Sequence, residues 1–317
     1  MHAPKVGLAL IHQIVKHACT FGGDKSRPTD DALVIEFDDG SRRFTYLDSY
    51  YWSREANGYY CVTSALMALE AWGHHRIDAG ESVETVTAEI LGEGDLPAAY
   101  LLVITDLLIS HWSKSRKAAL PFVGCPELLS LERTRQSRDS MGLNRGMFGD
   151  KEPRGMANLE SLRKRPSRGI PLEWILPHYL FGEPAEDGEA VRTRLETALS
   201  RLGPYESHSS MADPRLMAVH ALNLLDSQNY QTRTRRDEAG QEQTGYEYVA
   251  PAAETQHLEP MQLQMSARMA AMHLGGEVAN ALEDPEKSSR ELVARSLVWA
   301  REWTSPANLK PTTIIRF

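Results

Sequence analysis

The sequence has few cysteines, and their arrangement does not suit a disulfide framework. Cys19, Cys61 and Cys125 are odd in number and far apart, which argues against a small secreted fold held by disulfides. We therefore expect three reduced thiols.

Long hydrophobic runs are also lacking. The longest apolar stretch, residues 100–109, is interrupted by Thr105 and Asp106 and is shorter than the roughly 20 residues that a membrane span needs. Residues 6–15 are apolar as well, but they contain His12, and no cleavage site typical of a signal peptide follows them. These absences predict a cytoplasmic protein with no membrane partner.

No complete catalytic or metal-binding motif is present. A phosphate-binding loop ends in Gly-Lys and a hydroxyl residue, because its amides and ammonium hold phosphates; the chain has no Gly-Lys pair, and its nearest approach, residues 22–26, follows a predicted helix. Zinc needs about four converging ligands, yet no C-x-x-C or H-E-x-x-H occurs, nor does the G-x-S-x-G of a nucleophile elbow. We expect no catalytic residue, bound metal or cofactor.

Dispersed acids and bases leave one alternative open. Glu70 and His74 are four residues apart on a predicted helix, where such a pair contributes only about 0.2–0.5 kcal/mol at a surface, so a structural pair is favoured. The alternative is an enzyme of unrecognised family that uses residues such as Glu70, His74, His75 and Asp106. A deep pocket lined by them, with strongly perturbed pKa values, would favour it.

What the chain does contain is enough apolar material for a large core. Of its 317 residues, 42% are hydrophobic and 25% are charged, which is typical of ordered globular proteins. This length suits two ordinary domains or one elongated array of packed helices.

Hydrophobic periodicity predicts a mostly α-helical fold. Apolar residues recur at helical spacing over residues 56–77, 81–91 and 96–112, with short polar joints typical of helical hairpins. Residues 33–46 instead predict two short strands around a glycine-containing turn. The expected fold is an irregular α-solenoid of stacked helical hairpins, like HEAT or armadillo arrays, with one short β-hairpin near the N-terminus.

The glycine- and proline-containing residues 139–155 mark the main predicted boundary. They divide the chain into an N-terminal helical array at residues 1–138, a basic loop at 139–155, and a C-terminal helical array at 156–317 that is incomplete at its end. Within the last of these, residues 233–245 are polar and predict a loop.

The middle of the chain is a local basic segment. The protein has a net charge of −8, but residues 133–168 hold ten basic and four acidic residues, a net of +6 that leaves −14 elsewhere. These side chains could contact phosphates or an acidic partner surface, while the favoured alternative is a solvated loop paired with the chain's own carboxylates. The candidates are Arg133, Arg135, Arg138, Arg145, Arg154, Arg163, Lys164, Arg165 and Arg168.

Five stretches of the sequence carry a resemblance to a known family. Residues 51–56, 64–72, 96–99, 120–128 and 218–230 resemble the helical-repeat region of very large bacterial STAND-like ATP-binding proteins, several of which act in antiphage defence. The resemblance covers about half of the chain, in helical patches.

In that family the nucleotide site lies in a separate NTPase domain, so any ATPase activity would need a domain that this chain lacks, and no catalytic residue carries over. The resemblance implies a non-enzymatic scaffold or sensing region that binds a protein partner or the remaining domains of a larger NTPase. The alternatives are the enzyme described above and a nucleic-acid-binding module that uses residues 133–168.

Overall fold

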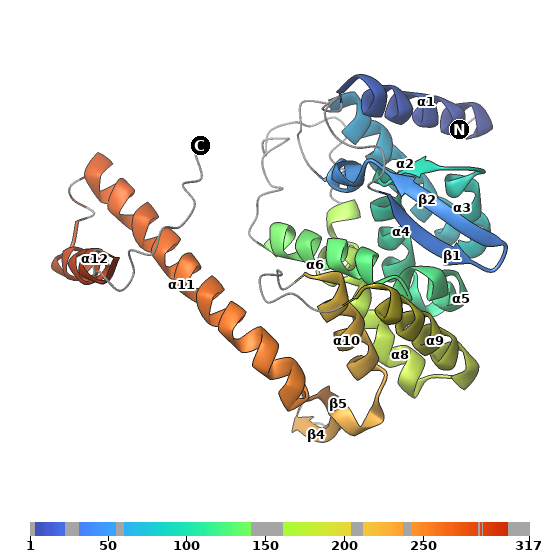
Figure 1. The fold of residues 1–317 in the computed structure, drawn as a ribbon. Helices are drawn as coiled ribbons and strands as arrows, with labels where there is room; N and C mark the ends of the chain where they lie inside the picture. The colour runs from blue at the N-terminus through green and yellow to red at the C-terminus, as the bar shows by residue number, and fades with distance from the viewer. Residues whose placement is uncertain are drawn as a thin grey trace. The chain divides into compact units, whose positions relative to one another are not determined.

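The computed structural model describes residues 4–22, 32–54, 60–140, 161–203, 212–236, 242–284, 286 and 288–303. The described chain is mostly helical, with a β-hairpin near its N-terminus, as predicted (Figure 1). It divides into two compact units, residues 1–251 (unit 1) and residues 252–317 (unit 2). Among the described helices, none combines the length and apolarity needed to cross a bilayer.

Unit 1 contains most of the secondary structure. Its first part runs in the order α1 (Pro4–Gly22), β1 (Leu33–Phe37), β2 (Gly40–Thr45), the 3-10 helix η1 (Leu47–Tyr51), α2 (Tyr60–Asp78), α3 (Val83–Leu91), β3 (Leu96–Pro97), α4 (Ala99–Ser110), α5 (Trp112–Val123) and α6 (Pro126–Ser140). Its second part runs in the order η3 (Pro166–Arg168), η4 (Leu172–Ile175), α8 (Leu176–Phe181), α9 (Ala185–Arg201), α10 (Pro214–Leu224), η5 (Ser227–Asn229), β4 (Tyr230–Arg236) and β5 (Glu242–Tyr248).

Helix α4 forms the centre of unit 1. Every residue from Ala99 to Ile109 is buried, as expected for a mostly apolar helix at the centre of a core; the buried Asp106 is the charged exception. It contacts α2, α3, α5 and η1, and Figure 1 shows it in the middle of these elements. The other helices of the first part are therefore arranged around α4.

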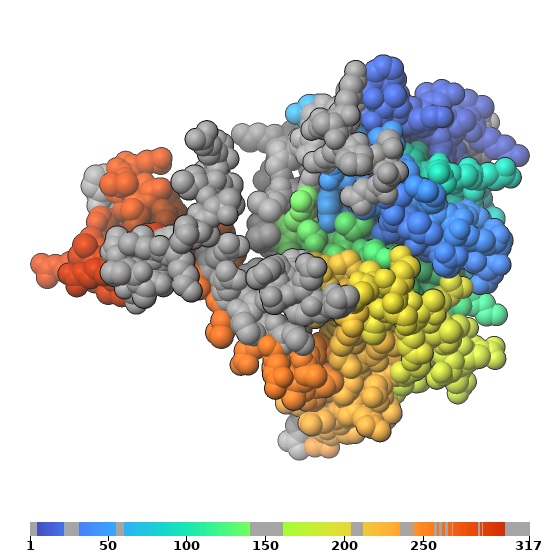
Figure 2. All heavy atoms as spheres, viewed as in Figure 1, coloured from blue at the N-terminus to red at the C-terminus, as the bar shows by residue number. Residues whose placement is uncertain are grey.

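The predicted hairpin is present and gains a third strand. Strands β1 and β2 pair antiparallel from Leu33 opposite Phe44 to Phe37 opposite Gly40, and β3 pairs parallel to β2. Gly40 has a φ of 132° at the turn, a conformation that favours glycine. Arg194 of α9 donates to the Glu36 carbonyl at 2.6 Å, so the hairpin and α9 adjoin on the face shown in Figure 2.

A second hairpin occupies the region predicted as a loop at residues 233–245. Strands β4 and β5 pair antiparallel from Tyr230 opposite Tyr248 to Arg236 opposite Glu242. Their threonines and tyrosines favour strands, and the Tyr230 and Tyr248 rings meet at 5.6 Å. The loop prediction was wrong because residues 233–245 themselves are almost all polar, charged or glycine, while the aromatic residues of the hairpin, Tyr230, Tyr246 and Tyr248, flank that range.

The compact units divide at a different place from the predicted boundary at residues 139–155. Of that predicted loop, residues 139 and 140 lie in α6 and the rest lies outside the described residues. Helix α6, before the loop, contacts α10, after it, and the Ser130 hydroxyl donates to the Ala212 carbonyl. These contacts join the first predicted array to the start of the second, so residues 1–138 and 156–251 both belong to unit 1, and the division falls after Pro251.

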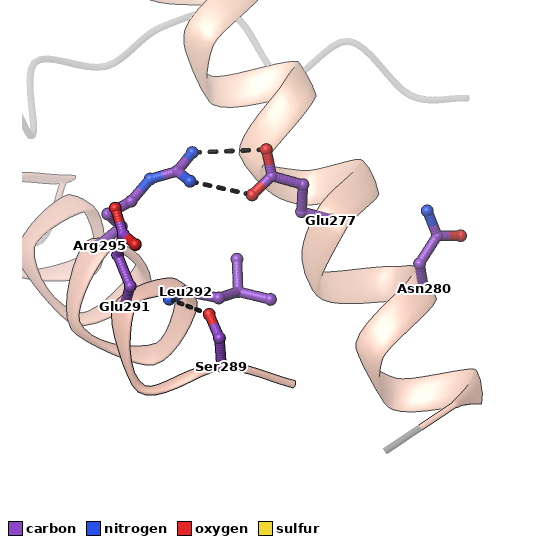
Figure 3. Close-up of a pocket in the computed structure, with 6 residues that line it drawn as sticks. All are labelled: Glu277, Asn280, Ser289, Glu291, Leu292 and Arg295. Carbon is purple, nitrogen blue, oxygen red and sulfur yellow. Dashed lines mark hydrogen bonds and ion pairs between the residues drawn. The ribbon is translucent and has the colours of Figure 1, made fainter. Parts of the chain in front are cut away.

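Unit 2 consists, in its described part, of the long helix α11 (Ala252–Glu283) and helix α12 (Arg290–Trp303). Leu274 of α11 and Leu292 of α12 are buried, and Arg295 donates to Glu277 at 3.0 and 3.5 Å. A pocket between the two helices is lined by Asn280 of α11, by Ser289, which precedes α12, and by Glu291 of α12 (Figure 3).

The close approach of α2 and α4 generates a test of the packing. A Cβ at Gly73 would lie 2.7 Å from Leu107 Cδ1, so we expect Gly73→Ala to lower the free energy of unfolding by about 1–2 kcal/mol through overpacking. In a Leu107→Ala background the clash is absent, and Gly73→Ala should instead raise the free energy of unfolding by up to about 1 kcal/mol through helix propensity. Urea denaturation of the four proteins measures both effects. Equal effects in the two backgrounds would contradict the contact.

Candidate functional site: a buried chain of ion pairs

Charged side chains gather inside unit 1, where α2, α4, α6 and the segment around η3 meet. Ion pairs join them into one series, which we call the ion chain. It comprises Glu70, Arg168, Asp106, Arg54, Asp139, Arg135 and Glu132.

The first half of the ion chain is centred on Asp106. Arg168 Nη2 donates to both carboxylate oxygens of Glu70, at 2.8 and 2.9 Å, and Arg168 Nη1 donates to Asp106 Oδ2 at 3.0 Å. Arg54 Nη2 donates to the other oxygen of Asp106 at 2.6 Å. Asp106, 1% exposed, is therefore held between two guanidinium groups.

The second half is centred on Arg135. Arg54 Nε lies 3.8 Å from Asp139 Oδ2, and Arg135 Nη1 donates to the same oxygen at 2.8 Å. Arg135 Nε and Nη2 donate to the two oxygens of Glu132 at 3.0 and 2.9 Å. This paired geometry is the strong form of an arginine–carboxylate contact.

Local helix geometry explains part of this arrangement. Glu132, Arg135 and Asp139 are three and four residues apart on α6, so they share one face. Arg135 also donates to the carbonyls of Ser167 and Ile170, each at 2.9 Å, and thereby fixes the segment around η3 to α6. The ion chain connects elements that are distant in sequence.

One end of the ion chain is closed by hydrogen-bond donors. The Tyr50 hydroxyl donates to Glu132 Oε1, and the Leu172 amide donates to Oε2 at 3.3 Å. Burial, reinforced by the charge of Glu132, raises the pKa of Tyr50, so the phenol keeps its proton and remains a donor.

The other end, at Glu70, meets two histidines. His74 Nε2 lies 3.6 Å from Glu70 Oε1, and His74 Nδ1 lies 2.9 Å from His111 Nε2. His111 Nδ1 lies 3.8 Å from Asp78 Oδ1, and the Asp78 side chain is 50% exposed. A row of titratable groups therefore runs from a fully buried carboxylate to the surface.

Burial controls the protonation of these groups. Burial raises the pKa of Glu70 to about 7, with Arg54 opposing the shift, and it raises the pKa of Asp106 to about 7 against the same guanidinium. Burial also lowers the pKa of His74 and of His111, each to about 4. At neutral pH both imidazoles are uncharged, while the buried carboxyls lie close to their titration midpoint.

The structure places four of the nine predicted contact residues in ion pairs with the chain's own carboxylates. Arg135 and Arg168 belong to the ion chain, Arg133 donates to Glu173 at 2.5 Å, and Arg165 donates to Asp78 at 2.7 Å. Arg135 is 1% exposed, so its side chain offers almost no surface to a partner.

The other five lie apart from the ion chain or outside the described residues. Arg138 stacks over the Tyr51 ring at 4.2 Å, Arg163 and Lys164 are exposed, and Arg145 and Arg154 lie outside the described residues. A partner contact by this segment stays a prediction.

Sequence reasoning found some of the site and missed the rest. It singled out Glu70, His74 and Asp106, and the structure brings these three together, whereas His75 faces outward. It missed Arg54 and treated Arg135 and Arg168 as surface groups. The spacing of Glu132, Arg135 and Asp139 was the available signal for a shared helix face.

The arrangement offers acid–base groups, but they are heavily engaged. Both oxygens of Glu70, Asp106 and Glu132 accept hydrogen bonds from guanidinium groups or the backbone. Among the described residues, no group of three or more His, Cys, Asp or Glu side chains is arranged to hold a metal ion.

No protein-family model matches this sequence, and no curated protein is significantly similar to it. Function must therefore be argued from the chemistry of the molecule itself.

Removing one member of the ion chain should be far more damaging than removing a surface ion pair. We expect Arg135→Ala to lower the free energy of unfolding by about 3–5 kcal/mol, because the buried carboxylate of Glu132 would lose the guanidinium that pairs with it. The control is Arg201→Ala, which removes an ion pair with Glu127 at the surface, where the Arg201 side chain is 58% exposed. This substitution should lower the free energy of unfolding by less than about 1 kcal/mol. Chemical denaturation measures both, and similar losses would contradict a structural ion chain.

Proposed function

We propose that the chain is a non-enzymatic helical scaffold or sensing region that binds a protein partner. The observation that carries this proposal is the apolar outer face of α12. Val293, Leu297 and Val298 have exposed fractions of 51%, 53% and 54%, and clustered exposed apolar side chains are typical of protein interaction sites.

The helical geometry of α12 separates this face from its packing face. Leu292 is buried, while Val293 and Leu297, four residues apart, lie on a different stripe of the same helix. Within the described residues, Val293, Leu297 and Val298 stay more than half exposed beside α11. The kind of partner that fits is a protein presenting an apolar groove or helix face.

The ion chain supports a structural role for the interior of unit 1. Its carboxylates are occupied by guanidinium groups of the same chain, and buried ion pairs of this kind fix one arrangement of the elements they join. An active site needs a position for the reacting atom beside its acid and base, and the described contacts of Glu70 and Asp106 are made to the chain itself.

We propose further that this scaffold is an irregular α-solenoid, HEAT- or armadillo-like, that is part of or derived from a larger STAND-like NTPase defence protein in the cytoplasm. The contacts of α2 with α4 and of α10 with both α6 and α9 support a stacked arrangement of helices. The resembling residues 64–72 and 218–224 lie on α2 and α10, so two of the patches belong to packed helices. The nucleotide chemistry would then belong to a domain outside this sequence.

One observation favours the enzyme alternative. Glu70, His74 and Asp106 converge, and burial raises the pKa of both carboxyls to about 7, a feature common at catalytic sites. The enzyme alternative requires that Glu70→Gln abolish a turnover that the folded wild-type chain performs. The scaffold proposal requires that binding to a partner survive the same substitution.

The nucleic-acid alternative has a direct test. Because four arginines of the basic segment already pair with carboxylates, we expect the full chain not to bind duplex DNA at low salt concentration. Fluorescence anisotropy at a low and a high salt concentration is the measurement. Binding at low salt that weakens steeply at high salt would instead support recognition of phosphates by this segment.

The α12 face generates a further prediction. The double substitution Val293→Ser and Leu297→Ser should leave the circular dichroism spectrum unchanged, because both side chains are exposed, and should abolish retention of the binding partner. The measurement is quantitative affinity capture with the wild-type chain and the variant side by side.

Val6→Ser with Leu10→Ser is the matched control. These residues are also four apart on a helix and are 69% and 55% exposed, so the control removes a similar apolar stripe from α1. The proposal predicts that a protein retained by the wild type and by this control is lost from the α12 variant. If the α12 variant retains the same proteins as the wild type, the α12 face is not the binding surface.

A further inference from the structure

The ion chain carries one more negative than positive charge. Carboxylates and guanidinium groups alternate along it from Glu70 to Glu132. The ion chain therefore has a carboxylate at each end, four carboxylates in all, and three guanidinium groups between them. The flanking ion pairs of Arg133 with Glu173 and of Arg165 with Asp78 are each balanced. Counted over these seven residues alone, the ion chain has one surplus negative charge, and a proton bound to one of its carboxyls would neutralise it.

The two ends of the ion chain differ in what compensates the charge. At Glu132, the Tyr50 hydroxyl, the Leu172 amide and Arg135 all donate to the carboxylate. At Glu70, within the described residues, Arg168 is the only guanidinium at ion-pair distance. Arg54 and Arg165 act on Glu70 from farther away, and His74 Nε2 lies 3.6 Å from its Oε1. The middle carboxylates each lie between two arginines, so Glu70 is the end at which a proton is best accommodated.

We propose that Glu70 and His74 together hold one exchangeable proton, and that His111 and Asp78 connect this proton-binding site to solvent. The distances along this route are 3.6 Å from Glu70 Oε1 to His74 Nε2, 2.9 Å from His74 Nδ1 to His111 Nε2, and 3.8 Å from His111 Nδ1 to Asp78 Oδ1. The 2.9 Å contact between two uncharged imidazoles requires that one ring donate an N–H to the other.

Proton transfer along this row is balanced. Asp78 takes a proton from water and passes it to His111 Nδ1, while His111 Nε2 releases its proton to His74 Nδ1. His74 Nε2 then releases its proton to Glu70 Oε1. Glu70 ends neutral, both imidazoles end as the other tautomer, and the reverse sequence returns the proton to solvent.

Charged groups from several elements face this site. Glu70 interacts electrostatically with charged groups of four segments. These groups are Arg54 after η1, Asp106 of α4, Asp139 of α6, and Arg165 and Arg168 at η3. On the histidines act Arg165, Asp106, Asp78 and Lys114. Helices α3 and α1 also contact α2. On α3, Glu89 accepts a hydrogen bond from Arg76, and Glu84 is exposed. On α1, His12 stacks on Tyr100, and the remaining charged or titratable side chains, Lys5, Lys16 and His17, are exposed.

The proton couples pH to the attachment of η3. When Glu70 is protonated, its ion pair with Arg168 loses its charge, while the ion pair of Arg168 with Asp106 remains. Because burial raises the pKa of Glu70 to about 7, the folded chain binds this proton more tightly than the unfolded chain does. Its contribution to stability is present at low pH and is lost as pH rises through about 7.

The buried histidines act in the opposite direction. Burial lowers the pKa of His74 and of His111 to about 4, so they contribute stability above pH 6.5 that is lost as pH falls through about 4. Between these limits the contributions of carboxyls and imidazoles offset one another in the overall stability. Each group must therefore be observed individually.

The test is a carbon-13 NMR titration of the glutamate carboxyls in the full chain between pH 5 and 9. We expect one glutamate carboxyl to titrate with a midpoint near 7, and we expect this titration to be lost in Glu70→Gln and retained in Glu84→Gln, an exposed control on α3. The proposal is overturned if no glutamate carboxyl titrates above pH 6 in the wild type, or if the titration near 7 survives in Glu70→Gln. If Glu70→Gln does not fold, the wild-type titration with simultaneous nitrogen-15 shifts of His74 decides.

The route to solvent has its own test. In His111→Asn the titration near 7 should remain, because Glu70 keeps its surroundings, while exchange of the His74 ring N–H with water should slow. Ring nitrogen NMR of the wild type and the variant measures this exchange. An unchanged exchange rate would remove His111 and Asp78 from the route.

Discussion

The ion chain is the interaction on which the rest of unit 1 depends. It links α2 through Glu70, α4 through Asp106 and α6 through Glu132, Arg135 and Asp139, and it binds the η3 segment through Arg168. The Arg54 and Arg135 guanidinium groups are buried at a desolvation cost of several kcal/mol that correctly placed carboxylates offset. This requirement excludes other relative placements of these elements more strictly than apolar packing does, because apolar contacts tolerate rearrangement.

The fold was predictable wherever a single residue pattern decided it. The apolar residues that recur over residues 96–112 predicted the helix that α4 confirms, and the glycine turn at residues 38–41 predicted the first hairpin. The second hairpin was missed because its strands are polar, so its stability derives from the Tyr230 and Tyr248 pair and cross-strand contacts that appear only after folding. The boundary at residues 139–155 stays a prediction, and composition could not indicate that α6 and α10 pack together on either side of it.

The site was predictable only where its members are neighbours on a helix. Glu70 and His74 are four residues apart, but Glu70 and Arg168 are 98 residues apart, and no local pattern pairs them. A count of basic residues over 133–168 detects excess charge without indicating whether it faces solvent or the interior. In that segment, Arg135 pairs with carboxylates on its own face of α6, and Arg168 pairs with carboxylates of α2 and α4. Part of the positive charge that the sequence suggested for the surface therefore lies inside unit 1.

Nitrogen-15 NMR of the arginine side chains tests this account most directly, because it reports on each guanidinium in the intact chain. If the ion chain forms, the guanidinium N–H groups of Arg54 and Arg135, with side chains 6% and 1% exposed, exchange with water much more slowly than those of the exposed Arg201. If Arg54 and Arg135 exchange as fast as Arg201, the arginines face solvent and the buried ion chain does not exist.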